Sequence, residues 1–274
     1  MKKNSAFIKK ISTNLIGLVI LLSILSCEKE SFVSGETNEF SLLSTSNGAT
    51  YDIKVGLPEE YTTDGEKYAT IYVLDGKDIF GFVANQCKQI SDNFNVKNAI
   101  VVSIGYGKNR SMDYTPTRVS SVTGGAPQFL NFIETQLIPA IQQKFNADTN
   151  RGSRVILGHS YGGLFGTYAF TMNNKVFGNY ILLSPSLWFD NMVSMQFEKE
   201  NRVKNKANHQ LVYMGIGKKE EKDRMLTPFE EFYQTLHENY PAIKLTKNLE
   251  SNEGHMGSRS PNIVNGLQYY FQNR

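Results

Sequence analysis

Cysteine is scarce in this chain, which has two cysteines, Cys27 and Cys87, among 274 residues. Cys27 ends an apolar run near the N-terminus, and if it is modified there, Cys87 has no partner for an internal disulfide. No histidine follows Cys87 in an arrangement that would activate a thiol. We therefore interpret Cys87 as a small buried hydrophobic residue.

Motifs for metals and cofactors are also lacking. The sequence has no His-Glu-x-x-His motif, no EF-hand calcium loop and no glycine-rich loop that would cradle phosphates after a first strand. We expect neither a metal nor an organic cofactor. Any chemistry must then come from the side chains themselves.

Charge of one sign is not in large excess, since 29 lysines and arginines face 26 acidic residues for a net charge of +3. Four of the lysines fall in the first ten residues, so the rest of the chain is near balance. No later Lys/Arg-rich block or RNA-binding signature occurs, and we expect no nucleic-acid partner. A hydrophobic content of 40% fits one globular domain with a sizeable core.

The N-terminus has the pattern of a targeting segment. A basic start precedes an apolar run over residues 15–25, which is shorter than the roughly 20 residues of a membrane-spanning helix. The run ends in Ile24-Leu25-Ser26-Cys27 and then turns polar, which resembles a bacterial lipoprotein signal with Cys27 as the lipidated residue. Leu25 stands where a small residue is more usual, so an uncleaved anchor or a plain secretory signal stays open.

These features divide the chain into three parts. We expect a lipoprotein signal peptide over residues 1–27, a flexible tether over 28–38 and a folded domain over 39–274. The protein would then lie in the cell envelope, attached to a membrane through the lipid on Cys27, on the periplasmic face or the outer surface. The oligomeric state and the membrane leaflet stay open.

Two strand patterns follow one another along the domain. Residues 51–55 alternate between apolar and polar with period two, after a first short strand at 40–43 and a Ser-Asn-Gly turn, which is typical of antiparallel strands. The later strands are nearly continuous apolar runs, typical of strands buried on both faces of a parallel sheet. These runs are residues 68–74, 99–104, 155–157, 180–183 and 211–214.

Helical stretches separate the apolar runs, the clearest over residues 129–145 with its apolar residues near one face. A last strand at 243–249 and a final helix near 263–271 complete the series. The alternation predicts an α/β fold with a doubly wound, mostly parallel sheet, antiparallel N-terminal strands and helices on both faces, as a three-layer αβα sandwich. No second domain or internal repeat is visible.

The motif Gly158-His159-Ser160-Tyr161-Gly162 directly follows one of the buried runs and precedes a segment that can be helical. A strand, a Gly-x-Ser-x-Gly turn and a helix are the context of the nucleophile elbow of α/β-hydrolases. The two glycines suit a tight turn that lifts the serine hydroxyl clear of the sheet. The sequence therefore predicts Ser160 as a nucleophile.

Such a serine needs a base, and the chain has four histidines. His159 lies inside the elbow, where its ring should point away from its neighbour's hydroxyl. His209 begins a strand, and His237 lies in a predicted helix over 228–239. His255 lies in a loop after the last strand, where the histidine of this fold is expected, so we predict His255 as the base.

The third member should be a carboxylate on the loop after the strand at 209–217. That loop carries Glu220, Glu221 and Asp223, and it is also an ordinary charged surface segment. The residues alone leave the acid open among these three. A two-residue serine–histidine arrangement also stays open, because some sites fix the histidine tautomer with a carbonyl or water.

An oxyanion hole needs two hydrogen-bond donors aimed at the developing negative oxygen. One should be the backbone N–H of Tyr161, the residue after the nucleophile. The other should come from the loop after the strand at 68–74, which places it at Lys77, with Gly76 as the alternative.

Several segments together resemble the esterase D-like "putative esterase" group of α/β-hydrolases, over about residues 40–272. The group includes siderophore esterases of the enterobactin type, S-formylglutathione hydrolases, feruloyl esterases and mycolyltransferases. The segments are Val-Leu-Asp-Gly at 73–76, Gly-His-Ser-Tyr-Gly-Gly-Leu at 158–164, Ser-Pro-Ser-Leu-Trp at 184–188 and Glu-Gly-His at 253–255.

The siderophore esterase branch is the most similar, because of Arg-Ser-Met-Asp-Tyr-Thr-Pro at 110–116 and Gly-Lys-Lys-Glu at 217–220. The second segment implies that Glu220 is the acid. The resemblance also implies that Arg110 lies at the mouth of the site, although a structural pairing with Asp113 is an alternative. Trp188 would line the pocket wall, or else be a plain core residue.

We therefore expect a serine esterase that hydrolyses carboxylic esters, such as siderophore trilactones, through an acyl-enzyme. The alternatives are a feruloyl or acetyl polysaccharide esterase and a hydrolase-fold binding lipoprotein without turnover. Transfer of the acyl group to an alcohol instead of water also stays open.

Overall fold

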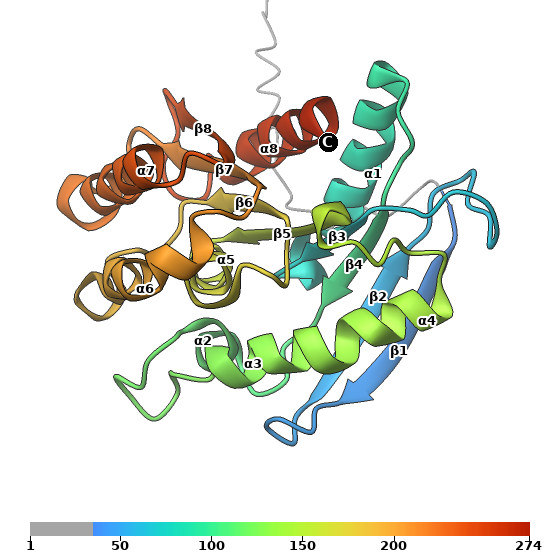
Figure 1. Cartoon of the computed structure of the whole chain (residues 1–274), viewed down its shortest axis with the longest axis horizontal. Coiled ribbons are helices and arrows are strands. Elements are labelled where there is room, and N and C mark those ends of the chain that lie inside the picture. The colour runs from blue at the N-terminus through green and yellow to red at the C-terminus, as the bar shows by residue number, and fades with distance from the viewer. Residues whose placement is uncertain (1–34) are drawn as a thin grey trace, which may run out of the picture.

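An eight-stranded sheet runs through the centre of the molecule in the computed structural model, which describes residues 35–274 (Figure 1). The strand order is β1-β2-β4-β3-β5-β6-β7-β8. The pairs β1–β2 and β2–β4 are antiparallel, and every other pair of neighbours is parallel. The strands are β1 (Thr37–Leu43), β2 (Thr50–Gly56), β3 (Thr70–Val73), β4 (Ile100–Ile104), β5 (Arg154–His159), β6 (Asn179–Leu183), β7 (Gln210–Gly217) and β8 (Ile243–Glu250).

Helices cover both faces of this sheet (Figure 1). One face packs against α1 (Gly76–Phe94) and α8 (Arg259–Asn273). The helices on the other face are α3 (Ala126–Phe132), α4 (Ile138–Lys144), α5 (Tyr161–Asn173), α6 (Phe189–Asn205) and α7 (Thr227–Asn239). A short helix, α2 (Arg110–Tyr114), lies beside α3 and α5.

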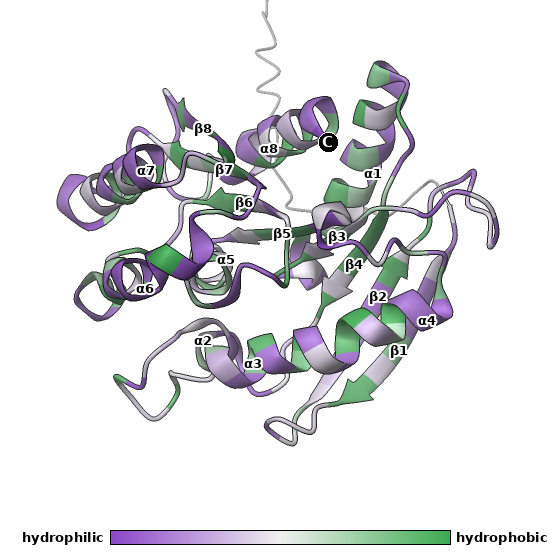
Figure 2. Ribbon diagram, in the orientation of Figure 1, coloured by the Kyte–Doolittle hydropathy of each residue, from purple (hydrophilic) through white to green (hydrophobic). Residues whose placement is uncertain are grey.

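The central strands are buried on both faces, which explains their continuous apolar sequences. In β3, Ile71 and Val73 belong to the core under α1 and α8, while Tyr72 and the following Leu74 belong to the core on the opposite face. Figure 2 shows hydrophobic residues along the inner strands and hydrophilic residues on the outer sides of the helices. The expected three-layer α/β-hydrolase fold is confirmed.

Two boundaries differ from the expectation. The first strand begins at Thr37, two residues before the expected start of the domain at Glu39. The expected helix over 129–145 is one continuous helical stretch from α3 through a π-helical turn, Ile133–Leu137, into α4. Pro139 follows this turn, and a proline has no N–H for the helix ladder and displaces a preceding carbonyl, which explains the wider turn.

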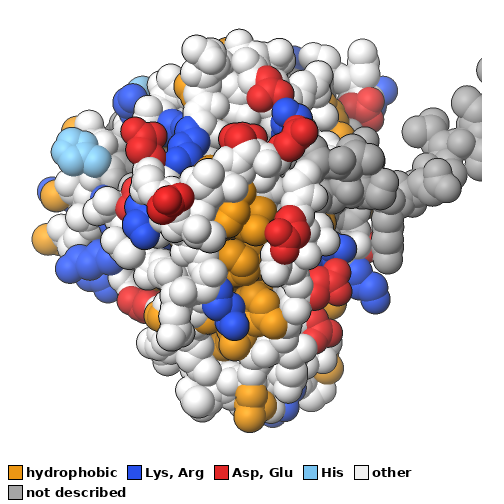
Figure 3. Space-filling model, turned by 90° about the vertical axis from the view of Figure 1, so that its right-hand side faces the viewer, with side chains coloured by type: hydrophobic (Ala, Val, Ile, Leu, Met, Phe, Trp, Pro, Cys, Tyr) orange, Lys and Arg blue, Asp and Glu red, His pale blue; other side chains and the backbone are white. Residues whose placement is uncertain are grey.

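The expected signal peptide 1–27, its Cys27 and all but the last four residues of the expected tether lie outside the described residues. Within residues 35–274, no helix combines the length and apolar character needed to cross a bilayer. Figure 3 shows one face of the molecule with a strip of hydrophobic side chains bordered by charged residues of both signs.

Candidate active site

Ser160 lies on the turn between β5 and α5, and its backbone there is strained. Its φ of 59° and ψ of −117° are unusual for a residue with a side chain. Gly158 permits the turn, since a Cβ there would lie 2.4 Å from the backbone carbonyl of Gly162. The backbone N–H of Ser160 donates to Leu183 of β6 at 2.9 Å, which ties the turn to the sheet.

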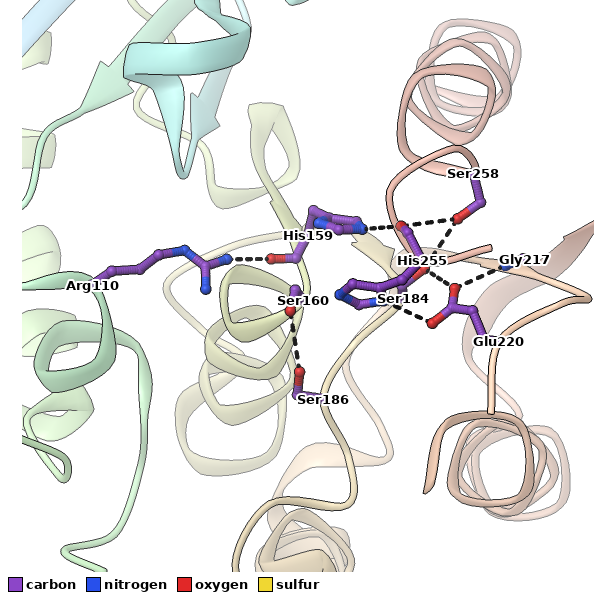
Figure 4. Close-up of polar contacts among 9 residues, drawn as sticks. All are labelled: Arg110, His159, Ser160, Ser184, Ser186, Gly217, Glu220, His255 and Ser258. Carbon is purple, nitrogen blue, oxygen red and sulfur yellow. Dashed lines mark hydrogen bonds and ion pairs between the residues drawn. The ribbon is translucent and has the colours of Figure 1, made fainter. Parts of the chain in front are cut away.

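His255 lies in the loop between β8 and α8, and Figure 4 shows its ring between Ser160 and Glu220. Its Nδ1 lies 2.7 Å from Oε2 of Glu220. The hydroxyl of Ser160 lies 3.4 Å from that of Ser186, and within residues 35–274 it has no hydrogen bond to His255. Such bonds are often loose without substrate and tighten during the reaction.

The carboxylate of Glu220 is buried and fully bonded, with its side chain 1% exposed against 37% for His255. Its Oε1 accepts from Ser184 Oγ at 2.6 Å and from the backbone N–H of Gly217 at 3.0 Å. Burial alone would raise the pKa of Glu220, but the bonds from His255, Ser184 and Gly217 outweigh it and lower that pKa. The group is therefore ionised at neutral pH.

The two other candidate acids do not reach the histidine. Glu221 and Asp223 are exposed, and in the described part of the chain neither bonds to His255. Glu221 lines the same cavity as Ser160, whereas Asp223 does not. The loop turns so that only the Glu220 side chain points inward.

Arg110 lies on the opposite side of Ser160 from His255 (Figure 4). Its guanidinium binds Asp75 through two hydrogen bonds of 2.7 and 2.8 Å, and its Nη2 also donates to the backbone oxygen of His159 at 3.0 Å. Tyr106 donates its hydroxyl to the same Asp75 carboxylate. Burial would lower the pKa of Arg110, but the bonds and charge of Asp75 raise it, so the cation is fixed in place.

The pairing of Arg110 corrects one alternative from the sequence. Arg110 pairs with Asp75 and not with Asp113, whose carboxylate accepts from the hydroxyl of Tyr51 at 3.0 Å and the backbone N–H of Gly107 at 2.9 Å. Asp75 was visible in the sequence as part of Val-Leu-Asp-Gly, but nothing local linked it to Arg110 35 positions later.

A cavity of about 420 Å³ joins these groups, with Ser160, His255, Arg110 and Tyr161 among its lining residues. Lys77 is not among them, because it lines a separate hollow with Gly76 beside α1 and β2. The structure therefore brings Tyr161 to the cavity but not Lys77. No cluster of three metal-binding side chains occurs within residues 35–274.

The far wall of the cavity is aromatic and cationic. The guanidinium of Arg224 lies 3.8 Å from the ring centroid of half-buried Trp188. Lys219, Glu221 and Met225 complete this side. None of the ion pairs in residues 35–274 includes Arg224, Lys219 or Glu221.

Comparison with known proteins identifies the family. The model described as "Putative esterase" matches residues 44–257. The chain belongs to this esterase family. The expected resemblance to its siderophore esterase branch is confirmed by the relatives that follow.

The Siderophore triacetylfusarinine C esterase of Aspergillus fumigatus is 29% identical to this chain. The match covers 61% of this chain and 62% of that protein. Ferri-bacillibactin esterase BesA of Bacillus subtilis is 28% identical over 72% of this chain and 76% of its own. The crystal structure of BES protein from Bacillus cereus superposes with a TM-score of 0.78 and 28% identity, covering 89% of this chain and 97% of that one.

Three features of this site were not predicted from the sequence. Ser184 directly follows β6 with a φ of 40° and points its hydroxyl at Glu220. Asp75 holds Arg110, and Arg224 stacks on Trp188 from within a charged run. Only the Ser-Pro-Ser-Leu-Trp motif hinted at the first of these, and the other two depend on contacts between distant elements.

Proposed function

We propose that this chain is a serine hydrolase that cleaves carboxylic esters through an acyl-enzyme on Ser160. The observation that carries the proposal is the 2.7 Å contact between Glu220 and His255, beside a serine on a strained elbow. A carboxylate that accepts from Nδ1 fixes the tautomer in which Nε2 has no hydrogen. That nitrogen can then accept the proton of the Ser160 hydroxyl.

The reaction follows from this arrangement. Ser160 Oγ attacks the carbonyl carbon of the ester while His255 Nε2 takes the hydroxyl proton. The tetrahedral intermediate breaks its bond to the alcohol oxygen, and His255 returns the proton to the leaving alcohol. A water molecule, deprotonated by His255, then attacks the acyl carbon, and Ser160 leaves with the proton.

The negative oxygen of the intermediate needs donors, and two groups on the cavity wall can supply them. One is the backbone N–H of Tyr161 at the start of α5, where the helix dipole also favours negative charge. The other is the guanidinium of Arg110, because Asp75 and His159 hold its Nε and Nη2. Within residues 35–274, its Nη1 has no hydrogen-bond partner, so it is free to donate.

Labelling with a fluorophosphonate and turnover of p-nitrophenyl butyrate test the proposal. Ser160→Ala and His255→Ala should abolish turnover, and Ser160→Ala should also abolish labelling. Ser186→Ala is the matched control, because it removes a neighbouring hydroxyl in the same cavity, and its labelling should persist. Turnover by folded Ser160→Ala would refute the mechanism.

For the substrate, we propose siderophore esters such as trilactones. The relatives named Siderophore triacetylfusarinine C esterase in Aspergillus fumigatus and Ferri-bacillibactin esterase BesA in Bacillus subtilis support this choice. The cavity wall supports it too, because Arg224 stacks on the ring of Trp188 and Lys219 also lines the cavity, and neither cation forms an ion pair within residues 35–274. Two carboxylates line the same cavity, but that of Glu220 is bound to His255, which leaves Glu221 to oppose the two cations. Such a wall suits an aromatic or anionic group on the ester.

A side-by-side panel of ferric siderophore trilactones, feruloyl sugars and acetyl sugars tests the substrate. We expect the highest kcat/KM on a trilactone. Higher kcat/KM on feruloyl or acetyl sugars would indicate a polysaccharide esterase. Binding of a trilactone without turnover, and without labelling of Ser160, would indicate a binding lipoprotein.

We further propose that Cys27 carries a lipid that attaches the enzyme to a membrane of the cell envelope. The support is the N-terminal sequence alone: a basic start, a short apolar run and a cysteine at its end. The full chain expressed in bacteria should partition into Triton X-114, and Cys27→Ser should leave it in the aqueous phase or unprocessed. Equal partitioning of both forms would contradict lipidation.

A further inference from the structure

His159 makes two contacts with the proposed base. Its buried side chain, which is part of a residue only 4% exposed, places Nε2 2.8 Å from the backbone oxygen of His255. A carbonyl oxygen can only accept, so Nε2 carries the hydrogen and donates. The two imidazole rings also pack together, with centroids 4.6 Å apart and planes tilted by 42°. One residue therefore holds both the backbone and the ring of His255.

We propose that His159 is a positioning residue that aligns His255 with Ser160, a role that rests on the proposed function. Glu220 holds the His255 ring through Nδ1 and makes no contact with the His255 backbone. Backbone bonds from Lys219 to Glu253 and from Ser258 to Gly254 hold the loop on either side, but they do not bind the His255 peptide itself. The bond from His159 fixes that backbone, and the ring contact restricts rotation of the imidazole. Ser258 Oγ also donates to the same oxygen, but at 3.4 Å this bond is longer than the 2.8 Å bond from His159.

His159 also ties the two sides of the site together. Its backbone oxygen accepts from Arg110 and its ring donates to His255, so Figure 4 shows it linking the groups on either side of Ser160. It is the last residue of β5, a strand buried between two parallel neighbours, and therefore cannot shift easily. The loop that carries His255 is thus anchored to the same rigid strand that leads into the nucleophile.

The ring of His159 must stay neutral for this role, because His255 becomes positively charged when it takes the serine proton. Burial, together with the neighbouring His255 and Arg259, lowers the pKa of His159 to about 4, against the opposing effects of the His255 backbone bond and Asp75. At neutral pH the ring therefore donates its hydrogen bond without placing a second cation beside the imidazolium.

Two substitutions separate positioning from simple packing. His159→Gln keeps an N–H donor at a similar reach, while His159→Phe keeps an aromatic ring and removes the donor. With p-nitrophenyl butyrate, we expect His159→Phe to lower kcat about 10- to 100-fold with little change in KM, because loss of alignment affects the chemical step. His159→Gln should recover most of that loss.

Thr171→Val is the matched control, since it removes a fully buried hydroxyl of α5 that donates to the backbone oxygen of Tyr168 and lies outside the site. It should lower Tm while leaving kcat within about twofold. If the Tm of His159→Phe falls as it does in Thr171→Val while its kcat stays at the wild-type value, the positioning role is wrong. If His159→Phe does not fold, His159→Asn replaces it, because its amide is too short to reach His255, and equal kcat for Asn and Gln would refute the role.

The same measurements separate a failure of the proposed serine hydrolase function from a failure of the positioning role of His159. A wild-type enzyme that neither turns over the ester nor labels at Ser160 contradicts the serine hydrolase itself. A wild-type enzyme that is active, with His159→Phe equally active, contradicts only the positioning role of His159.

Discussion

Glu220 and His255 are 35 positions apart in the sequence, yet the carboxylate of one lies 2.7 Å from Nδ1 of the other. Ser184 and Gly217 bond the remaining oxygen of Glu220, so this carboxylate has a single orientation. An anchored acid of this kind keeps the imidazole in the tautomer that can accept a proton.

Glu220→Gln should lower kcat by about 10²- to 10⁴-fold, because an amide no longer favours hydrogen on Nδ1 of His255. Glu221→Gln and Asp223→Asn are the matched controls on the same loop, and both should stay within about twofold of the wild type. Steady-state kinetics with p-nitrophenyl butyrate measure the effect. Near-wild-type kcat for Glu220→Gln would mean that serine and histidine act as a pair.

Arg110→Lys should lower kcat about 10²- to 10³-fold, as expected for loss of one donor to the oxyanion. Lysine keeps the charge but cannot bind Asp75 through a planar two-bond contact. Lys77→Pro is the informative comparison, because it removes the Lys77 backbone N–H in the first turn of α1, where proline is tolerated. Retained activity in Arg110→Lys with loss in Lys77→Pro would reverse the assignment.

Stability should fall at acid pH partly because of His159. Its pKa is about 4 in the folded protein against an ordinary value of 6.5, so the unfolded chain binds the proton more readily. The neutral ring of His159 makes its full contribution to the free energy of unfolding above about pH 6.5. That contribution is lost as the pH falls toward 4, and the free energy of unfolding is lower by about 2–3 kcal/mol at pH 4.5.

Urea unfolding at pH 7 and pH 4.5 checks this prediction. The drop in the free energy of unfolding between the two pH values should be about 2–3 kcal/mol smaller in His159→Gln than in the wild type. Glu220 titrates in both proteins and therefore cancels in the comparison. Equal drops would show that His159 is not held neutral by the fold.

Arg224→Gln should weaken the use of anionic esters. The test compares p-nitrophenyl hemisuccinate with uncharged p-nitrophenyl valerate, which have similar acyl lengths. We expect kcat/KM to fall about 3- to 10-fold on the hemisuccinate and to change little on the valerate. Lys206→Gln, an exposed lysine outside the cavity, is the control for net charge. Equal effects on both esters would argue against an anion preference.

The fold was predictable because its signals are local and repeated. Residues 51–55 alternate on a strand with one exposed face, and the continuous apolar runs are strands covered by helices on both sides. The helix starting at α3 was harder to bound, because the turn before Pro139 widens without breaking the helix. Such adjustments depend on packing and not on periodicity.

The sequence by itself determined Ser160, because a nucleophile elbow needs only a strand, a five-residue turn and a helix in succession. It also pointed to His255 by elimination among four histidines. The residues alone left the acid open among three carboxylates on one loop, and the family resemblance implied Glu220. The tertiary structure shows the carboxylate of Glu220 facing His255, because the turn of the loop backbone sets the direction of each side chain. Only the tertiary structure brought Arg110 to Ser160, because its bond to His159 spans 49 positions and its partner Asp75 lies on another element. Local spacing specifies elements, whereas the directions of side chains from separate elements follow from how those elements pack.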